Sequence, residues 1–115
     1  MDSDFALAGQ FGLSQPEFAA VRADLDERAP GWSAQPDGRI RLRTTPSCHI
    51  DIVSQLFGVA LVKTDLGDER YWTCGWSYTG PSPREAIGAA IDAGLPWDGS
   101  PASAPLGWTK ELATH

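Results

Sequence analysis

The stretch "PDGRIRLR", residues 36–43, predicts a tight turn followed by a strand that is apolar on one face and basic on the other. Pro, Asp and Gly are typical turn residues, and the alternation after them has the two-residue period of a β-strand. Ile40 and Leu42 then share one face, which we expect to lie against a core. The opposite face carries three arginines, which we expect to point outward: Arg39, Arg41 and Arg43.

The segments that follow predict an antiparallel sheet. Residues 48–57 fit a strand with Ile50 and Ile52 on one face, or a helix, and their β-branched side chains favour the strand. Residues 58–64 predict a mostly buried strand, residues 65–68 a hairpin loop, and residues 69–78 the strand that pairs back.

Two segments with capping residues predict helices before and after these strands. Ser14 and Glu17 form a capping-box pattern, so we expect a helix over about 15–28. Ser82 is a second N-cap residue, and Gly94 is a stop signal for a helix over about 82–94. The order helix, three or four strands, helix predicts a two-layer α+β sandwich with both helices on one face of an antiparallel sheet.

The length of 115 residues predicts one domain, which we place at 1–94, followed by a tail at 95–115. Pro, Gly and Ser in the tail predict an irregular chain, with a short helical turn near its end packed on the domain through Trp108. The sequence leaves open whether this tail is ordered and whether the protein is a monomer or a dimer.

The stretch "RYWTCGWSYTG", residues 70–80, places large rings at alternate positions, Trp72, Trp76 and Tyr78 among them. One interpretation makes this row the core face beneath the helices; the other places one or two rings in an open patch beside the arginines, a composition favoured at protein interfaces. Our candidate partner-binding residues are Arg39, Arg41, Arg43, Tyr71, Trp72, Trp76 and Trp108. A simpler interpretation of the arginines is pairing across strands with Asp51 or Glu69.

The charge balance restricts the partners. The chain has 9 basic and 15 acidic residues, a net charge of −6, and phosphate repels such a protein unless bases gather locally. The longest apolar stretch, residues 56–62, is too short to cross a membrane, and the first ten residues lack the basic residues of a signal peptide, so we expect a cytoplasmic protein. Cys48 and Cys74 are then expected to be reduced.

Signatures of catalysis are absent from the sequence. Cys48 and His49 are adjacent, so in a strand they face opposite ways and cannot form a catalytic dyad. The Cys and His residues lack the paired short spacings of a zinc site, and no phosphate-binding loop is present. We therefore expect no metal and no cofactor, and we favour a protein without enzymatic activity.

The element order resembles that of double-stranded RNA-binding domains. Such domains hold phosphates with a lysine cluster at the start of their last helix. Here the corresponding stretch, "PSPREAIGAA" at 81–90, has one Arg and one Glu. The resemblance therefore implies a fold and not RNA binding.

The leading functional hypothesis is a small acidic protein-binding module, an inhibitor, immunity or adaptor protein of bacterial or phage origin that acts on a basic protein. Acidic surfaces accelerate association with basic partners. Two alternatives remain open: a small-molecule-binding domain or enzyme with a pocket between sheet and tail, closed by Trp97 or Trp108, and nucleic-acid binding through the three arginines.

Overall fold

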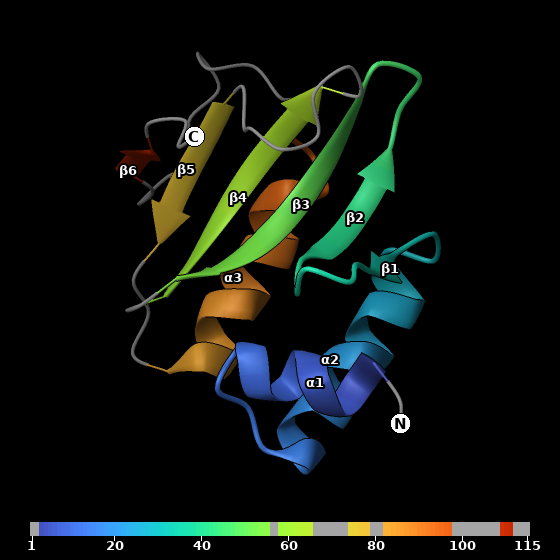
Figure 1. Ribbon diagram of the computed structural model, residues 1–115, viewed down its shortest axis with the longest axis vertical. Helices are drawn as coiled ribbons and strands as arrows, with labels where there is room; N and C mark the ends of the chain where they lie inside the picture. Colours follow the sequence, from blue (N-terminus) through green and yellow to red (C-terminus); the bar gives the residue numbers. More distant parts are fainter. Residues whose placement is uncertain (1–2, 56–57, 66–73, 79–81, 98–108, 112–115) are drawn as a thin grey trace.

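A computed structural model describes residues 3–55, 58–65, 74–78, 82–97 and 109–111 of the chain. Three helices and six strands follow in chain order: α1 (Ser3–Gln10), α2 (Gln15–Arg28), β1 (Ser33–Ala34), β2 (Ile40–Thr44), β3 (Cys48–Gln55), β4 (Gly58–Asp65), β5 (Cys74–Tyr78), α3 (Pro83–Gly94) and β6 (Thr109–Glu111). The architecture is the predicted α+β arrangement, with one helix before and one after an antiparallel sheet (Figure 1).

The sheet is a meander in which each strand pairs with the next one along the chain, β1-β2-β3-β4-β5-β6. All pairs are antiparallel, and four longer strands, β2 to β5, are flanked by the short β1 and β6. Residues 48–55 are a strand, which confirms the preference for strand over helix. The predicted hairpin loop at 65–68 lies almost entirely outside the described residues, as does the first part of the strand predicted at 69–78.

Local capping explains the bounds of the two longer helices. At the start of α2, the Ser14 hydroxyl accepts a hydrogen bond from the Glu17 backbone N–H at 3.2 Å, and the Ser14 N–H donates to the Glu17 carboxylate at 2.9 Å. At the start of α3, the Ser82 hydroxyl accepts from the Glu85 N–H at 3.2 Å. These bonds satisfy backbone groups that the first turn leaves unpaired, so both helices begin where the sequence predicts.

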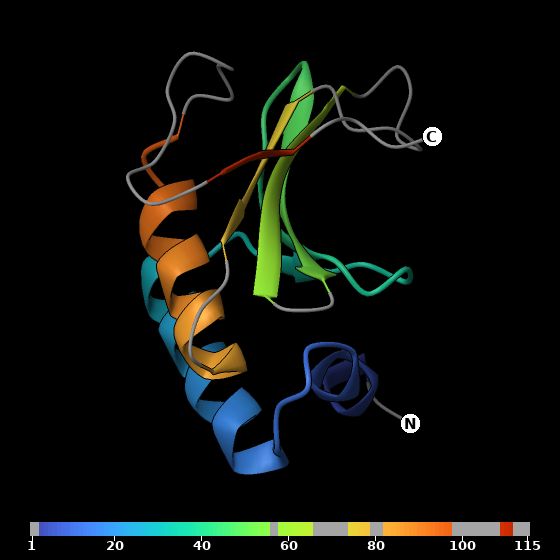
Figure 2. The same ribbon diagram turned by 90° about the vertical axis from the view of Figure 1, so that its left-hand side faces the viewer.

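The core lies between one face of the sheet and the pair α2 and α3 (Figure 2). Strand residues Ile40, Ile52 and Leu61 are fully buried there, as are Leu25 of α2 and Ile87 of α3. Helix α1 lies at the lower end of the molecule in Figure 1, and the apolar residues of 7–13 join the same core.

The C-terminal part of the chain differs from the prediction at one segment. Residues 109–111 form a strand, β6, against β5, where the sequence suggested a turn of helix. Trp97, three residues after α3, is 3% exposed and belongs to the core. Trp108, the predicted anchor, lies outside the described residues.

Candidate functional site

The centre of the β2–β3 pair holds a buried ion pair between Arg41 and Asp51. The two residues are direct partners in the sheet register, so their side chains leave the same face. Arg41 donates from Nε to Asp51 Oδ1 at 3.0 Å and from Nη2 to Oδ2 at 3.2 Å. Asp51 is fully buried, and the paired geometry is the strong two-bond form that arginine makes with a carboxylate.

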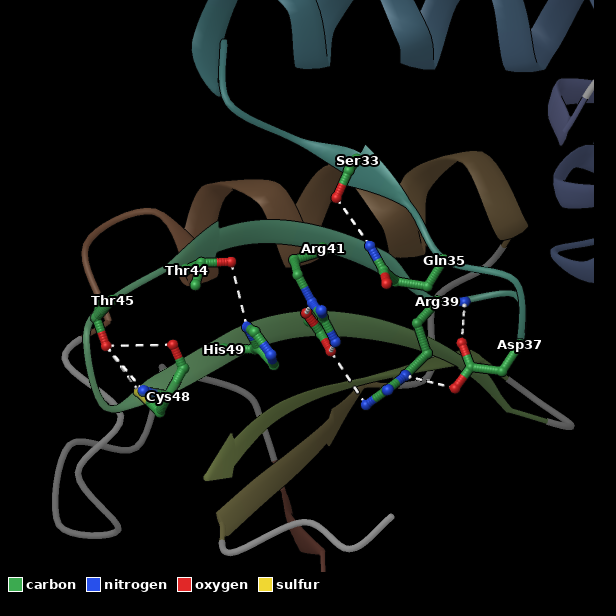
Figure 3. Close-up of polar contacts among 10 residues, drawn as sticks. Ser33, Gln35, Asp37, Arg39, Arg41, Thr44, Thr45, Cys48 and His49 are labelled. Atoms are coloured by element: carbon green, nitrogen blue, oxygen red, sulfur yellow. Dashed lines mark hydrogen bonds and ion pairs between the residues drawn. The ribbon is translucent and has the colours of Figure 1, made fainter. Parts of the chain in front are cut away.

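Arg39, the residue just before β2, joins this pair. Its Nη1 lies 3.1 Å from Asp51 Oδ2, and its Nε lies 2.9 Å from Oδ2 of Asp37 in the preceding turn. Figure 3 shows Arg39 with Asp37 on one side and Arg41 on the other. We call Asp37, Arg39, Arg41 and Asp51 the arginine–aspartate cluster. Two guanidinium groups and two carboxylates make the cluster neutral as a whole.

Arg43 does not belong to this cluster. The register shifts between Arg41 and Arg43, so that Leu42 is an extra residue and Arg43 lies opposite Ile50, a core residue. A β-bulge of this kind reverses the faces that the residues after it would otherwise take. Arg43 donates instead to the backbone carbonyl of Trp97, just beyond the end of α3.

The predicted outward row of three arginines is therefore wrong in two respects. The bulge removes Arg43 from the row, and Arg39 and Arg41 are enclosed, with side chains 13% and 11% exposed. On the face of the sheet away from the helices, Ala60 and Val62 of β4 are also fully buried. The simpler interpretation, pairing across strands with Asp51, is the one the structure shows.

Cys48 and His49 make separate contacts in the structure (Figure 3). The Thr44 hydroxyl lies 3.2 Å from His49 Nδ1, while Cys48 Sγ lies 3.3 Å from the Thr45 hydroxyl. Cys48 is a free, buried thiol, in agreement with the expected reduced state. Its strand and that of Cys74 are separated by β4, about 10 Å across two strand spacings, where a disulfide needs Cα atoms within about 7 Å.

The other concentration of charge lies on α2 and α3, which we call the helix layer. Six acidic residues belong to it: Glu17, Asp24, Asp26, Glu27, Glu85 and Asp92. Three basic residues accompany them: Arg22, Arg28 and Arg84. All of them are exposed except Asp24, which is half-buried. The layer has a net charge of −3, from six acids and three bases, half of the −6 of the whole chain.

One of these bases is engaged by two acids of the layer. Arg28 donates from Nη2 to Asp92 Oδ1 at 2.6 Å and from Nη1 to Asp24 Oδ2 at 3.3 Å, which ties α2 to α3. The hydrogen bond from Asp92 is the main cause that raises the pKa of Arg28 above its usual value. Arg28 therefore remains a cation, and its guanidinium group is paired with carboxylates of its own chain.

A second contact orients an acid of the layer. The Arg22 guanidinium lies over the Trp32 ring, 5.8 Å from its centroid, a distance suited to a cation–π contact. Trp32 donates from its indole Nε1 to Asp26 Oδ1 at 2.7 Å, which holds that carboxylate beside β1. Sequence reasoning did not select Trp32, although a tryptophan just after a helix is a candidate for such packing.

The aromatic candidates are placed only in part. Tyr78 lies opposite Val59 and packs half-buried against the core, and the backbone of Trp76 lies opposite Leu61, another core residue. Tyr71, Trp72 and Trp108 lie outside the described residues. The core interpretation of the aromatic row therefore holds for Tyr78.

Among the described residues, no group of three or more His, Cys, Asp or Glu side chains is arranged to hold a metal ion. No helix in the described part of the chain has the length and apolar character needed to cross a membrane. No protein-family model, curated protein or solved structure matches the chain.

Proposed function

We propose that the protein is a small protein-binding module, an inhibitor, immunity or adaptor protein, that contacts a basic protein through the helix layer. The observation that carries the proposal is that the clustered charges of the sheet are paired, whereas the helices carry more acids than bases. The clustered bases of the sheet are held by Asp37, Asp51 and the Trp97 carbonyl, whereas the helix layer leaves acids in excess.

The acids of the helix layer differ in the contacts that their carboxylates make within the protein. Asp24 and Asp92 contact Arg28, and Glu17 caps its own helix. Asp26, Glu27 and Glu85 are exposed, although Asp26 also accepts the hydrogen bond from Trp32. A basic partner would meet these three carboxylates first. Such complementarity accelerates association and makes it sensitive to salt.

The alternative of nucleic-acid binding receives less support. It relied on three arginines presented in a row, and two of these are enclosed beside carboxylates while the third faces the other way. The small-molecule alternative relied in part on Trp97 as a lid, and this ring is 3% exposed in the core. A gel shift at about 50 mM salt tests the first alternative directly.

Affinity capture with mass spectrometry tests the proposal. The bait is the wild-type protein, compared with a helix-layer variant that combines Asp26→Asn, Glu27→Gln and Glu85→Gln. The matched control changes the net charge equally outside the layer, with Asp2→Asn, Asp4→Asn and Glu111→Gln. We expect a basic protein to be captured by wild type and control and lost from the helix-layer variant.

The result that would overturn the proposal is equal capture by all three baits, or capture of acidic proteins alone. The circular dichroism spectrum of the helix-layer variant should match the wild type, because its three substituted residues are exposed, and the spectrum of the control is recorded beside it. The cytoplasmic location and the bacterial or phage origin remain part of the proposal. They rest on the short apolar stretches and on the excess of arginine over lysine, 7 to 2.

A further inference from the structure

The enclosed part of the arginine–aspartate cluster has an excess of positive charge. Arg39 and Arg41 have side chains 13% and 11% exposed, and the Asp51 carboxylate between them is fully buried. Among these three described residues, two cations and one anion sum to one positive charge. Asp37, whose side chain is 57% exposed, supplies the balancing carboxylate from the surface.

The contact between Asp37 and Arg39 is not well formed. Asp37 Oδ2 lies 2.9 Å from Arg39 Nε, yet this buried Nε–H has no hydrogen bond of good geometry. An enclosed donor without a partner is costly, and an oxyanion placed in line with the N–H would satisfy it. An exposed ion pair contributes little stability, so Asp37 competes weakly for this position.

We propose that Arg39 and Arg41 form a binding site for a small oxyanion, a carboxylate or phosphate group, and that Asp37 occupies this site until the anion displaces it. The planar fork of guanidinium donors matches both groups. The site lies on the sheet, so the inference is independent of the helix layer and of the proposed function.

The turn that carries Asp37 has its own supports, which makes the displacement feasible. Gly38 N–H donates to the Gln35 carbonyl at 3.0 Å, and Gln35 N–H donates to the Arg39 carbonyl at 2.9 Å. Gly38 has a φ of +90°, which glycine adopts without strain. The turn can therefore keep its shape when the Asp37 side chain leaves Arg39, or when asparagine replaces it.

The test follows the Arg39 Nε–H resonance of the ¹⁵N-labelled protein by NMR. Sodium phosphate and sodium acetate are titrated separately at constant pH and ionic strength, with sodium chloride as the reference salt. Asp37→Asn removes the competing carboxylate, and we expect it to tighten anion binding about two- to fivefold. This factor corresponds to the free energy that an exposed ion pair contributes. In Arg39→Gln, which lacks that resonance, the Arg41 Nε–H resonance should show no saturable shift, and the spectrum should retain the dispersion of a folded protein.

The matched control is Asp92→Asn, which removes an exposed carboxylate from Arg28 and leaves Asp24 in contact with that arginine. A saturable shift with phosphate alone assigns a phosphate site, and one with acetate alone assigns a carboxylate site; either supports the inference. Absence of a saturable shift in Asp37→Asn with both anions would overturn it. An equal response of Arg28 in Asp92→Asn would also overturn it, because the effect would then follow net charge.

Discussion

Replacing Asp51 with asparagine tests whether the arginine–aspartate cluster is part of the interior. Asp51 is fully buried and contacts Arg41 at 3.0 and 3.2 Å and Arg39 at 3.1 Å. Removal of its charge takes away the carboxylate that lies between the two enclosed guanidinium groups of Arg39 and Arg41. Loss of one partner from a buried ion pair costs about 3 to 5 kcal/mol, so we expect a loss of this size in the free energy of unfolding.

Urea unfolding followed by circular dichroism gives that free energy, and thermal unfolding checks it. For a chain of about this size, 1 kcal/mol corresponds to about 4 °C, so Tm should fall by about 12 to 20 °C. Asp92→Asn, at a carboxylate with a side chain 70% exposed, should cost about 1 kcal/mol or less. A loss as small as this for Asp51→Asn would refute an interior cluster.

A compensating pair of substitutions separates lost charge from lost packing. Asp51→Leu combined with Arg41→Met replaces both partners by apolar groups, so Arg39 is the one enclosed charge of the cluster that loses a partner, and it keeps Asp37. We expect this double variant to be more stable than Asp51→Asn. A double variant that is less stable would show that the ion pair itself contributes net stability.

Three further predictions concern the helices. Gly94→Ala should destabilise the protein by about 1 to 3 kcal/mol through overpacking, because its Cβ would lie 2.5 and 2.9 Å from two buried leucine methyl groups. Gly88→Ala, whose Cβ would have no atom within 4 Å, should stabilise the protein by up to about 1 kcal/mol. Urea midpoints that rank the two variants in reverse would contradict the packing. Ser82→Ala should cost about 1 kcal/mol of unfolding free energy, and an unchanged value would rule out the cap. Hydrogen bonds with Ser14 hold the pKa of Glu17 below its usual value of 4.5. The stability that the Glu17 carboxylate contributes is therefore present above that usual value and is lost as pH falls through the lowered pKa. The free energy of unfolding should depend less steeply on acid pH in Glu17→Gln, and identical curves for variant and wild type would contradict this.

The elements that the sequence predicts well are those with local signals. The helix predicted at 15–28 has those bounds in the structure, because the Ser14 cap and Pro30 lie next to the residues they control. The strands β2 to β4 follow from turn residues and alternation for the same reason. The strands β1 and β6 have two and three residues, too few to show a period.

The candidate site was predicted less well because its geometry depends on distant residues. Strict alternation places Arg43 with Arg41, and no Gly or Pro marks the bulge at Leu42. The partner of Arg43 is the Trp97 carbonyl, 54 positions along the chain, which no local pattern indicates. The burial of Arg39 and Arg41 follows from Asp51, whose pairing was foreseen only as an alternative to an exposed row.

The most direct test of the central claim measures binding of the captured basic protein to the wild-type protein and the helix-layer variant by isothermal titration calorimetry at several salt concentrations. The account predicts a Kd that weakens as salt rises for wild type, and a variant that binds at least about tenfold more weakly at low salt. Equal affinity of the two proteins, or affinity independent of salt, would contradict the assignment of the contact surface to α2 and α3.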